Sequence, residues 1–253
     1  MTNETYFKNR HTVRQYTTQD VDEALLERML EAAAHAPTTG GMQLYSVVVT
    51  RDADRKRRLA PAHFGQSMVT AAPVVLTFCV DWNRFTRWCL ASDAEPGFDN
   101  AQSLMSAVLD TAIFAQQFCT IAEMNGLGTC YLGTTTYNPA PIAEVLDLPE
   151  RVLPLVTVTL GYPAPEDDDA PRTERLPLEA VTHSERYADY DEERVKRLYR
   201  EKEQMEQNRR FVKENGKRTL AQVFTDVRYP RTVSDQFSKT LLDFCRKNMK
   251  TDF

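Results

Sequence analysis

Apolar and polar positions along the chain follow two different periods. In residues 21–36 apolar side chains recur every three or four residues, which predicts an amphipathic helix with Asp20 as its N-cap. A break follows at residues 37–41. Residues 44–50 and 73–81 are continuous apolar runs rich in β-branched residues, and they predict two strands, the second buried on both faces.

The middle of the chain is apolar on several faces. Residues 99–124 are rich in Ala, Leu, Gln and Met, which predicts a long helix that needs cover from a large core or from a second subunit. Extended structure should resume at 130–133, a short helix should begin at Asn138, and residues 152–160 form a further apolar run typical of a buried strand. Strands alternating with helices indicate a single α/β or α+β domain.

The character of the sequence changes towards the C-terminus. Residues 164–174 have the polar composition of a loop, and residues 190–216 are dense in charge and poor in aliphatic side chains. Apolar spacing returns at residues 224–244. We therefore expect a core over residues 1–187 and a helical C-terminal extension over residues 188–253 that packs on it.

Composition excludes several classes of protein. The 253 residues carry a net charge of -5, which argues against a general nucleic-acid binder, because such proteins have a dominant basic face. No apolar run approaches the ~18 residues of a membrane span, and the first ten residues lack the apolar segment of a signal peptide. We expect a cytoplasmic protein with no membrane partner. The five cysteines are widely spaced and fit neither a disulfide framework nor a zinc site.

A cationic pattern lies close to the N-terminus. Arg10, Thr12 and Arg14 occupy alternate positions, so in an extended segment they project to one side. Two guanidinium groups and a hydroxyl suit a phosphate. For these three residues alone a solvated surface strand is the simpler interpretation, because charged side chains are mostly exposed.

Two glycine-rich turns are further candidates for a binding site. Residues 37–43 combine glycines, hydroxyls and an amide that suit a flat ligand, although an ordinary helix-to-strand turn has the same composition. Residues 126–135 offer free backbone N–H groups near a strand end. Their spacing matches neither the dinucleotide fingerprint nor a P-loop.

The sequence contains no recognisable set of protein nucleophile, acid and base. The four histidines, at 11, 35, 63 and 183, have no triad or metal-site spacing, and the common hydrolase and zinc motifs are absent from the sequence. If the protein is an enzyme, a cofactor supplies the difficult chemistry. We therefore assign no catalytic side chain and no metal ligand.

In combination, these signals resemble the flavin-dependent nitroreductase family, and within it the oxygen-insensitive NADPH nitroreductase/flavin reductase subgroup. The resemblance covers about residues 5–187, and residues 224–244 look like the subgroup's C-terminal extension. The stretches that carry it are residues 10–14, 36–43, 65–66, 79–84, 127–133, 148–149, 160–163 and 175–177.

This resemblance implies a fold and an assembly. The fold is α+β, with a central mixed, mainly antiparallel sheet wrapped by helices. The assembly is an intertwined homodimer with two FMN sites at its interface. The long helix over residues 99–124 fits the dimer-core helix of the family, which accounts for its lack of a polar face.

The resemblance also implies a set of FMN-binding positions. The phosphate would be held by Arg10 and Thr12, with His11 nearby and Arg175 completing the clamp. Arg14 would lie towards the pyrimidine end of the ring, where a cation stabilises the negative charge that accumulates at flavin N1 on reduction. Gln66 would hydrogen-bond the pyrimidine edge.

Two further segments would meet the isoalloxazine ring. One consists of Thr38, Thr39, Gly40 and Gln43, and the resemblance implies that it comes from the partner subunit. The other covers one ring face with backbone N–H groups near N5 and consists of Tyr131, Leu132, Gly133 and Thr134.

The sequence departs from the family pattern at three places. Threonines and glycines replace the serine-rich stretch at residues 38–41. Thr173 stands where a lysine is usual, two residues before Arg175. Either Arg172 substitutes for this lysine, or the phosphate site carries one cation fewer. Thr134 stands where a second glycine usually follows Gly133.

The activity implied is that of an FMN-dependent NAD(P)H oxidoreductase. It would reduce nitroaromatics or quinones by two electrons, in a ping-pong hydride transfer through flavin N5 with NADPH or NADH as donor. Arg228 is a candidate for contact with the extra phosphate of NADPH, and a surface ion pair is the alternative. Two other functions stay open: the same fold with reductive dehalogenation or flavin-consuming chemistry, and a non-catalytic module that docks a partner through residues 190–216.

Overall fold

The computed structural model describes residues 3–165 and 175–249. These residues form two compact units. The first unit combines the residues up to 165 with those from Phe237 onwards, and the second runs from Arg175 to Gln236. The division falls earlier than the expected boundary at residue 187. The chain returns to the first unit because Phe244 and Met249 are buried in its core.

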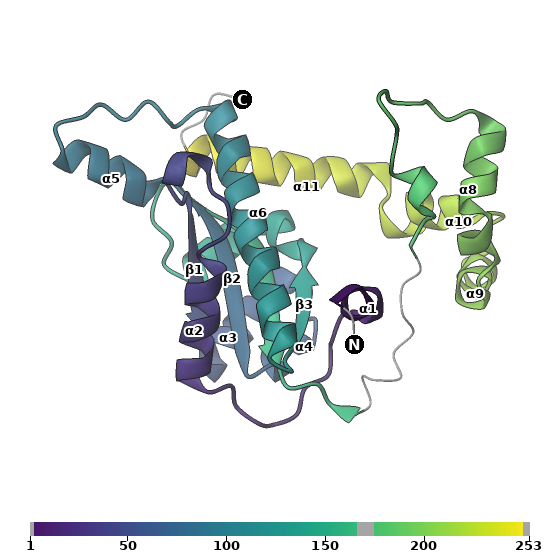
Figure 1. The fold of residues 1–253 in the computed structure, drawn as a ribbon, viewed down its shortest axis with the longest axis horizontal. Coiled ribbons are helices and arrows are strands. Elements are labelled where there is room, and N and C mark those ends of the chain that lie inside the picture. Colours follow the sequence, from purple (N-terminus) through teal and green to yellow (C-terminus); the bar gives the residue numbers. More distant parts are fainter. Residues whose placement is uncertain (1–2, 166–174, 250–253) are drawn as a thin grey trace. The chain divides into compact units, whose positions relative to one another are not determined.

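The first unit is built on a four-stranded antiparallel sheet with the order β1-β2-β4-β3 (Figure 1). The central strands β2 and β4 are buried along almost their whole length, as their continuous apolar sequences predict. No parallel pair occurs among the strands of the described residues, so the sheet of one chain is less mixed than expected. The strands are β1 (Tyr45–Thr50), β2 (Val74–Asp81), β3 (Gly128–Leu132) and β4 (Val152–Gly161).

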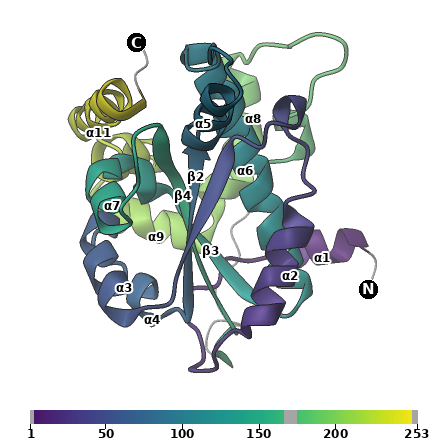
Figure 2. The same cartoon turned by 90° about the vertical axis from the view of Figure 1, so that its left-hand side faces the viewer.

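Helices cover both faces of this sheet (Figure 2). On one face lie α2 (Glu23–Ala33) and α6 (Ala101–Met124), and on the other lie α3 (Ala53–Leu59), α4 (Met68–Ala71) and α7 (Pro139–Val145). Phe78 of β2 belongs to the core under α2 and α6, whereas Val75 of the same strand belongs to the core under α3, α4 and α7. This alternation follows from the two-residue period of a strand.

The long helix α6 is apolar enough, by length and composition alone, to cross a membrane. The prediction that no segment approaches the composition of a membrane span was therefore wrong for this helix. In the first unit α6 packs on the sheet, where Phe114 and Phe118 join the main core. This packing accounts for the apolar composition of the face turned to the sheet.

The N-terminus of α2 corrects a detail of the sequence analysis. The N-cap is Asp22, whose carboxylate accepts a hydrogen bond of 2.8 Å from the backbone N–H of Leu25. Asp20 lies two residues earlier and instead pairs with Arg51 at 2.8 Å. Val21, between the two acids, is buried in the core ahead of the helix.

Short elements connect these layers in the first unit. They are α1 (Asn3–Asn9), η1 (Thr39–Gly41), η2 (Ala60–His63), α5 (Asn83–Ala91), η3 (Gly133–Tyr137) and the π-helical turn η7 (Cys245–Met249). All five cysteines are free and buried.

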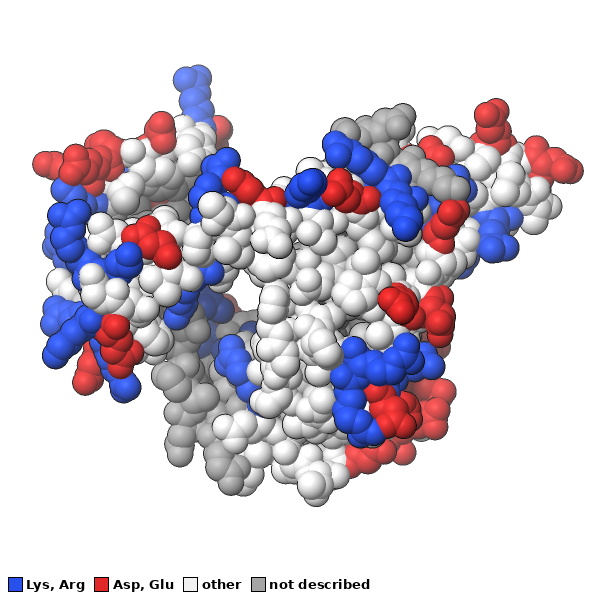
Figure 3. Space-filling view, turned by 180° about the vertical axis from the view of Figure 1, so that it is seen from behind, with Lys and Arg blue, Asp and Glu red and all other residues white. Residues whose placement is uncertain are grey.

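The second unit is helical. It contains η5 (Leu178–Ala180), α8 (Glu192–Gln204), α9 (Glu206–Glu214), α10 (Leu220–Val223) and the π-helical turn η6 (Phe224–Arg228), and α11 (Arg231–Phe244) leads back to the first unit. On the face shown in Figure 3, basic and acidic side chains are interspersed.

Candidate flavin site

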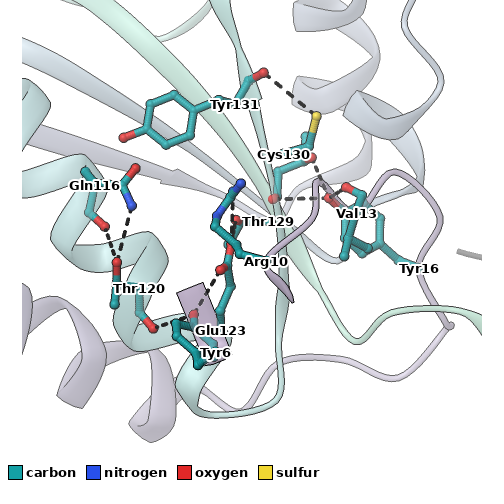
Figure 4. Close-up of polar contacts among 11 residues, drawn as sticks. Tyr6, Arg10, Val13, Tyr16, Gln116, Thr120, Glu123, Thr129, Cys130 and Tyr131 are labelled. Atoms are coloured by element: carbon teal, nitrogen blue, oxygen red, sulfur yellow. Dashed lines mark hydrogen bonds and ion pairs between the residues drawn. The ribbon is translucent and has the colours of Figure 1, made fainter. Parts of the chain in front are cut away.

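Arg10 is held by a carboxylate from α6. Its Nη2 atom lies 3.1 Å from Oε1 of Glu123, whose side chain is 9% exposed. The same carboxylate accepts hydrogen bonds from the hydroxyls of Tyr6, at 2.9 Å, and Thr129, at 2.6 Å. Figure 4 shows these side chains reaching Glu123 from two segments, the N-terminal one and β3. Burial and the bond to Glu123 raise the pKa of Tyr6 above its ordinary value.

The segment that follows Arg10 lies against β3. The backbone N–H of Val13 donates to the carbonyl of Thr129 at 3.0 Å. Gly128 makes this approach possible, because a Cβ at that position would lie only 2.5 Å from the Val13 side chain. Val13 is buried, while Thr12 is half-buried and Arg14 is exposed.

The turn around residues 38–43 is organised by a second carboxylate of α6. Asp110 is 2% exposed and accepts the hydroxyl of Thr38 at 2.6 Å and that of Thr39 at 2.9 Å. It also accepts the backbone N–H of Thr39 at 2.9 Å. The backbone N–H of Gln43 donates to the Thr38 hydroxyl oxygen. Both threonine hydroxyl protons are therefore directed into the protein.

The two carboxylates that anchor these segments lie far apart in one chain. Asp110 and Glu123 are separated by thirteen residues on the same helix, α6. At a rise of about 1.5 Å per residue they are about 20 Å apart along its axis. The segment of Thr38 and the segment of Arg10 are therefore anchored at well-separated levels of α6.

Two of the predicted FMN-binding residues, from different segments of the chain, lie close together. The Nε2 atom of Gln66 lies 3.5 Å from Oγ1 of Thr134, and Nδ1 of His63 lies 2.9 Å from the same oxygen. Gln66 follows η2, and Thr134 lies in η3 just after β3. His63 is fully buried, and this burial lowers its pKa to about 4.

Hydrogen bonds of Thr135 hold the turn that carries Gly133. The hydroxyl of Thr135 donates to the carbonyl of Leu132 at 2.8 Å and accepts the backbone N–H of Thr157 at 2.9 Å. Gly133 itself is exposed, and a Cβ added to it would meet no atom within 4 Å. Tyr131 is also exposed, whereas Leu132 is buried in the core.

Two predicted cations lie in the second unit. Arg228 stacks on the rings of Phe211 and Phe224, with its guanidinium carbon 5.0 and 5.2 Å from their centroids. These three residues help to line a pocket of about 180 Å³ that also includes Lys202. Arg175 belongs to the same unit. Arg172 and Thr173 lie outside the described residues.

Metal-ligating side chains do not gather in the described parts of the chain. Among residues 3–165 and 175–249, no group of three His, Cys, Asp or Glu side chains is placed to hold a metal ion.

Comparison with known proteins identifies the family. The sequence profile of the nitroreductase family matches residues 7–162, well over half of the chain. The chain belongs to the nitroreductase family. The resemblance inferred from the sequence is therefore confirmed, and so is its α+β fold.

Individual relatives of this family agree over most of the chain. An oxygen-insensitive NADPH nitroreductase from Salmonella typhimurium is 35% identical over 74% of this chain and 75% of its own length. An FMN reductase [NAD(P)H] from Bacillus subtilis is 33% identical over 73% of this chain and 74% of its own length. The crystal structure of a proposed oxidoreductase from Bacteroides fragilis is 50% identical, with a TM-score of 0.95, and covers 98% of this chain and 100% of its own.

The side chains that hold the predicted FMN-binding residues in place carry little signal in the sequence. Asp110 and Glu123 are isolated acids within an apolar helix, and that isolation was the one available signal, since a carboxylate in such a helix is buried only when it is paired. His63 carried no signal, because nothing in its neighbourhood indicates which side chain it meets.

The arrangement fits FMN by the chemistry of its donors and by its shape. Arg10, Thr12 and Gln66 supply a cation, a hydroxyl and an amide, which suit a phosphate and a pyrimidine edge. Gly133 is not required by the packing of the chain, since an added Cβ would point into open space. A flat ligand that approaches the backbone closely is a reason to have a glycine there.

Proposed function

We propose that this chain is an FMN-dependent NAD(P)H oxidoreductase that reduces nitroaromatic compounds or quinones. The observation that carries the proposal is the meeting of Gln66 and Thr134 beside the open backbone of Gly133. The names of the relatives, an NADPH nitroreductase and an FMN reductase, support the same cofactor pair.

Different residues of the chain would bind different parts of the cofactor. Arg10 and Thr12, with His11, would hold the phosphate. Gln66 and Arg14 would meet the pyrimidine end, and residues 131–134 would cover one face of the ring. Bound FMN supplies two-electron hydride chemistry, between a nicotinamide donor and an oxidant that use the same open face in turn.

Arg10 is suited to a phosphate even while paired. Its guanidinium carries five N–H donors in a rigid plane, and the contact with Glu123 engages one nitrogen. The pairing removes rotational freedom from the side chain before any ligand arrives, so less entropy is lost on binding. Glu123 therefore orients Arg10, while the remaining donors are available to phosphate oxygens.

A homodimer completes this proposal. Met105, Leu109 and Ile113 follow one another at four-residue intervals on α6 and are 58%, 58% and 40% exposed. Next to them is an open, mainly apolar groove of about 490 Å³ that includes Ile113 and Ile121. A second copy that covers this stripe would explain its composition. It would also bring the Thr38 segment, about 20 Å from Arg10 along α6, to the other subunit's flavin.

The test begins with purification. We expect a yellow dimer whose visible absorption bleaches on anaerobic addition of NADPH and returns on addition of a nitrofuran or a quinone. A colourless protein that also takes up no added FMN would refute the proposal. Consumption of the flavin during turnover would replace it with flavin-consuming chemistry on the same fold.

A further inference from the structure

Two turns that are distant in the sequence are joined by polar contacts. Nδ1 of His63, the last residue of η2, lies 2.9 Å from Oγ1 of Thr134 in η3. The side chain of Asn138, just after η3, donates from Nδ2 to the carbonyl of Ala62 at 2.8 Å. The relative position of the two turns is thus set by two hydrogen bonds.

The two partners of the first contact differ in exposure. His63 has no exposed surface, and its Nε2 atom has no hydrogen-bond partner among the described residues. Thr134 is half-buried, so its hydroxyl lies between the buried imidazole ring of His63 and the solvent. Burial without a counter-charge lowers the pKa of His63 to about 4, and the ring is neutral near pH 7.

The isolated Nε2 atom decides the tautomer. A neutral imidazole has one N–H donor and one acceptor nitrogen. With the proton on Nδ1, the donor is satisfied by Thr134 and only a lone pair is left unpaired at Nε2. With the proton on Nε2, a buried N–H would have no acceptor, a situation that folded proteins rarely tolerate. We therefore place the proton on Nδ1.

This tautomer directs the threonine hydroxyl. Thr134 Oγ1 accepts from His63, and the donor nitrogen of Gln66 lies 3.5 Å from the same oxygen. Both neighbours are donors, so the hydroxyl proton has no acceptor in either of them. It is left to donate away from the two side chains.

The backbone between His63 and Gln66 makes a tight turn. Phe64 and Gly65 have φ values of 56° and 67°. Phe64 is the left-handed C-cap of η2, and its backbone N–H donates to the carbonyl of Pro61 at 3.0 Å. This turn reverses the chain, and both His63 and Gln66 reach Thr134.

We propose that His63 is a positioning residue, which holds Thr134 Oγ1 as an acceptor so that the hydroxyl proton is presented to the edge of the bound flavin. The inference rests on the proposed function. A glycine at position 134, usual in the family pattern, offers a backbone N–H alone. The threonine of this chain adds a second donor, and His63 fixes its direction.

The test measures FMN binding by flavin-stripped protein, followed by flavin fluorescence. Thr134→Val removes the hydroxyl at similar volume, and we expect the Kd for FMN to rise about fivefold, the effect of one neutral hydrogen bond. His63→Leu should raise it by a similar factor. His63→Asn, which keeps an N–H close to the place of Nδ1, should stay within about twofold of the parent protein. Thr18→Val, at an exposed position outside the proposed site, is the control and should leave the Kd unchanged.

The double variant His63→Leu with Thr134→Val separates positioning from structure. If His63 acts through Thr134, the double variant binds FMN with the same Kd as Thr134→Val. If His63→Leu does not fold, His63→Phe takes its place in the single and the double variant. Independent, multiplying effects would overturn the proposal, as would an unchanged Kd in Thr134→Val. A parent protein that takes up no FMN would refute the proposed function itself, which keeps the two failures distinct.

Discussion

Arg10 and Glu123 form an ion pair, with Nη2 3.1 Å from Oε1, between the N-terminal segment and the C-terminal part of α6. The cation proposed to hold a phosphate is therefore already oriented by the protein. Because the same carboxylate accepts from Tyr6 and Thr129, it connects three segments of the chain. Arg10 thus has a structural partner as well as a proposed ligand.

Replacement of this carboxylate should destabilise the fold. In Glu123→Ala the guanidinium of Arg10 and two hydroxyls lose their acceptor, and we expect the free energy of unfolding to fall by about 2–4 kcal/mol. Urea denaturation measures it. Glu27→Ala, at an exposed position of α2, is the control and should change the value by less than about 0.5 kcal/mol. Equal losses in the two variants would show that the Glu123 contacts contribute nothing.

His63 should make stability depend on pH. Its pKa is about 4 in the folded protein and about 6.5 when unfolded, so below pH 6.5 the unfolded chain takes up a proton that the folded chain does not. Stability is therefore complete above pH 6.5 and is lost as the pH falls towards 4. Between pH 7.5 and pH 5 we expect a loss of about 2 kcal/mol from this group.

Urea denaturation of His63→Asn at the two pH values checks this expectation. The variant should lack that part of the decline. His35→Asn, at an exposed position, should decline as the parent protein does. A decline of the same size in His63→Asn would contradict the assignment.

Gly133 should matter for the ligand and not for the fold. An alanine Cβ would meet no protein atom within 4 Å, and Gly133 does not have a positive φ. We expect Gly133→Ala to unfold like the parent protein, yet to bind FMN at least about tenfold more weakly, a change of about 1.4 kcal/mol. Gly97→Ala has equally open surroundings and is the matched control. Unchanged FMN affinity in Gly133→Ala would remove this turn from the proposed site.

The exposed stripe of α6 should decide the oligomeric state. Leu109 is 58% exposed on this helix, and Leu109→Lys places a charge within the proposed interface. We expect sedimentation velocity to show a monomer in place of a dimer, with loss of bound FMN. Val49→Lys, on the edge strand β1, should remain dimeric. A dimeric Leu109→Lys that keeps its flavin would place the interface elsewhere.

Arg228 should discriminate between the two nicotinamide donors. A cation that meets the extra phosphate of NADPH contributes nothing to NADH binding, so Arg228→Gln should raise KM for NADPH by about tenfold or more and leave KM for NADH nearly unchanged. Steady-state kinetics with both donors measures the ratio. Arg231→Gln, a neighbouring cation paired with Asp235, is the control. A parallel rise in both KM values would assign Arg228 to the aromatic stack alone.

Much of the fold was predictable because its signals are local. The apolar runs at residues 44–50, 73–81 and 152–160 correspond to β1, β2 and β4, and residues 99–124 correspond closely to α6. Strand and helix periods depend on neighbouring residues, so one sequence is enough to find them. The N-cap of α2 lies two residues later than predicted, at Asp22, and Asp20 instead pairs with Arg51, a partner distant in the sequence.

The candidate site was predictable in part. The family pattern pointed to Gln66 and Thr134, and the fold brings them within 3.5 Å. It did not point to His63, which stands beside both of them.

By itself the sequence determined the order of helices and strands, the apolar character of α6 and the side chains able to bind a phosphate and a flat ring, because each depends on residue type and local spacing. The tertiary structure alone decided that Arg10 meets Glu123, that Thr38 meets Asp110 and that His63 meets Thr134. The members of each pair are more than seventy positions apart. The first two contacts arise when the chain packs against α6, and the third when η2 packs against η3, so no local pattern encodes them.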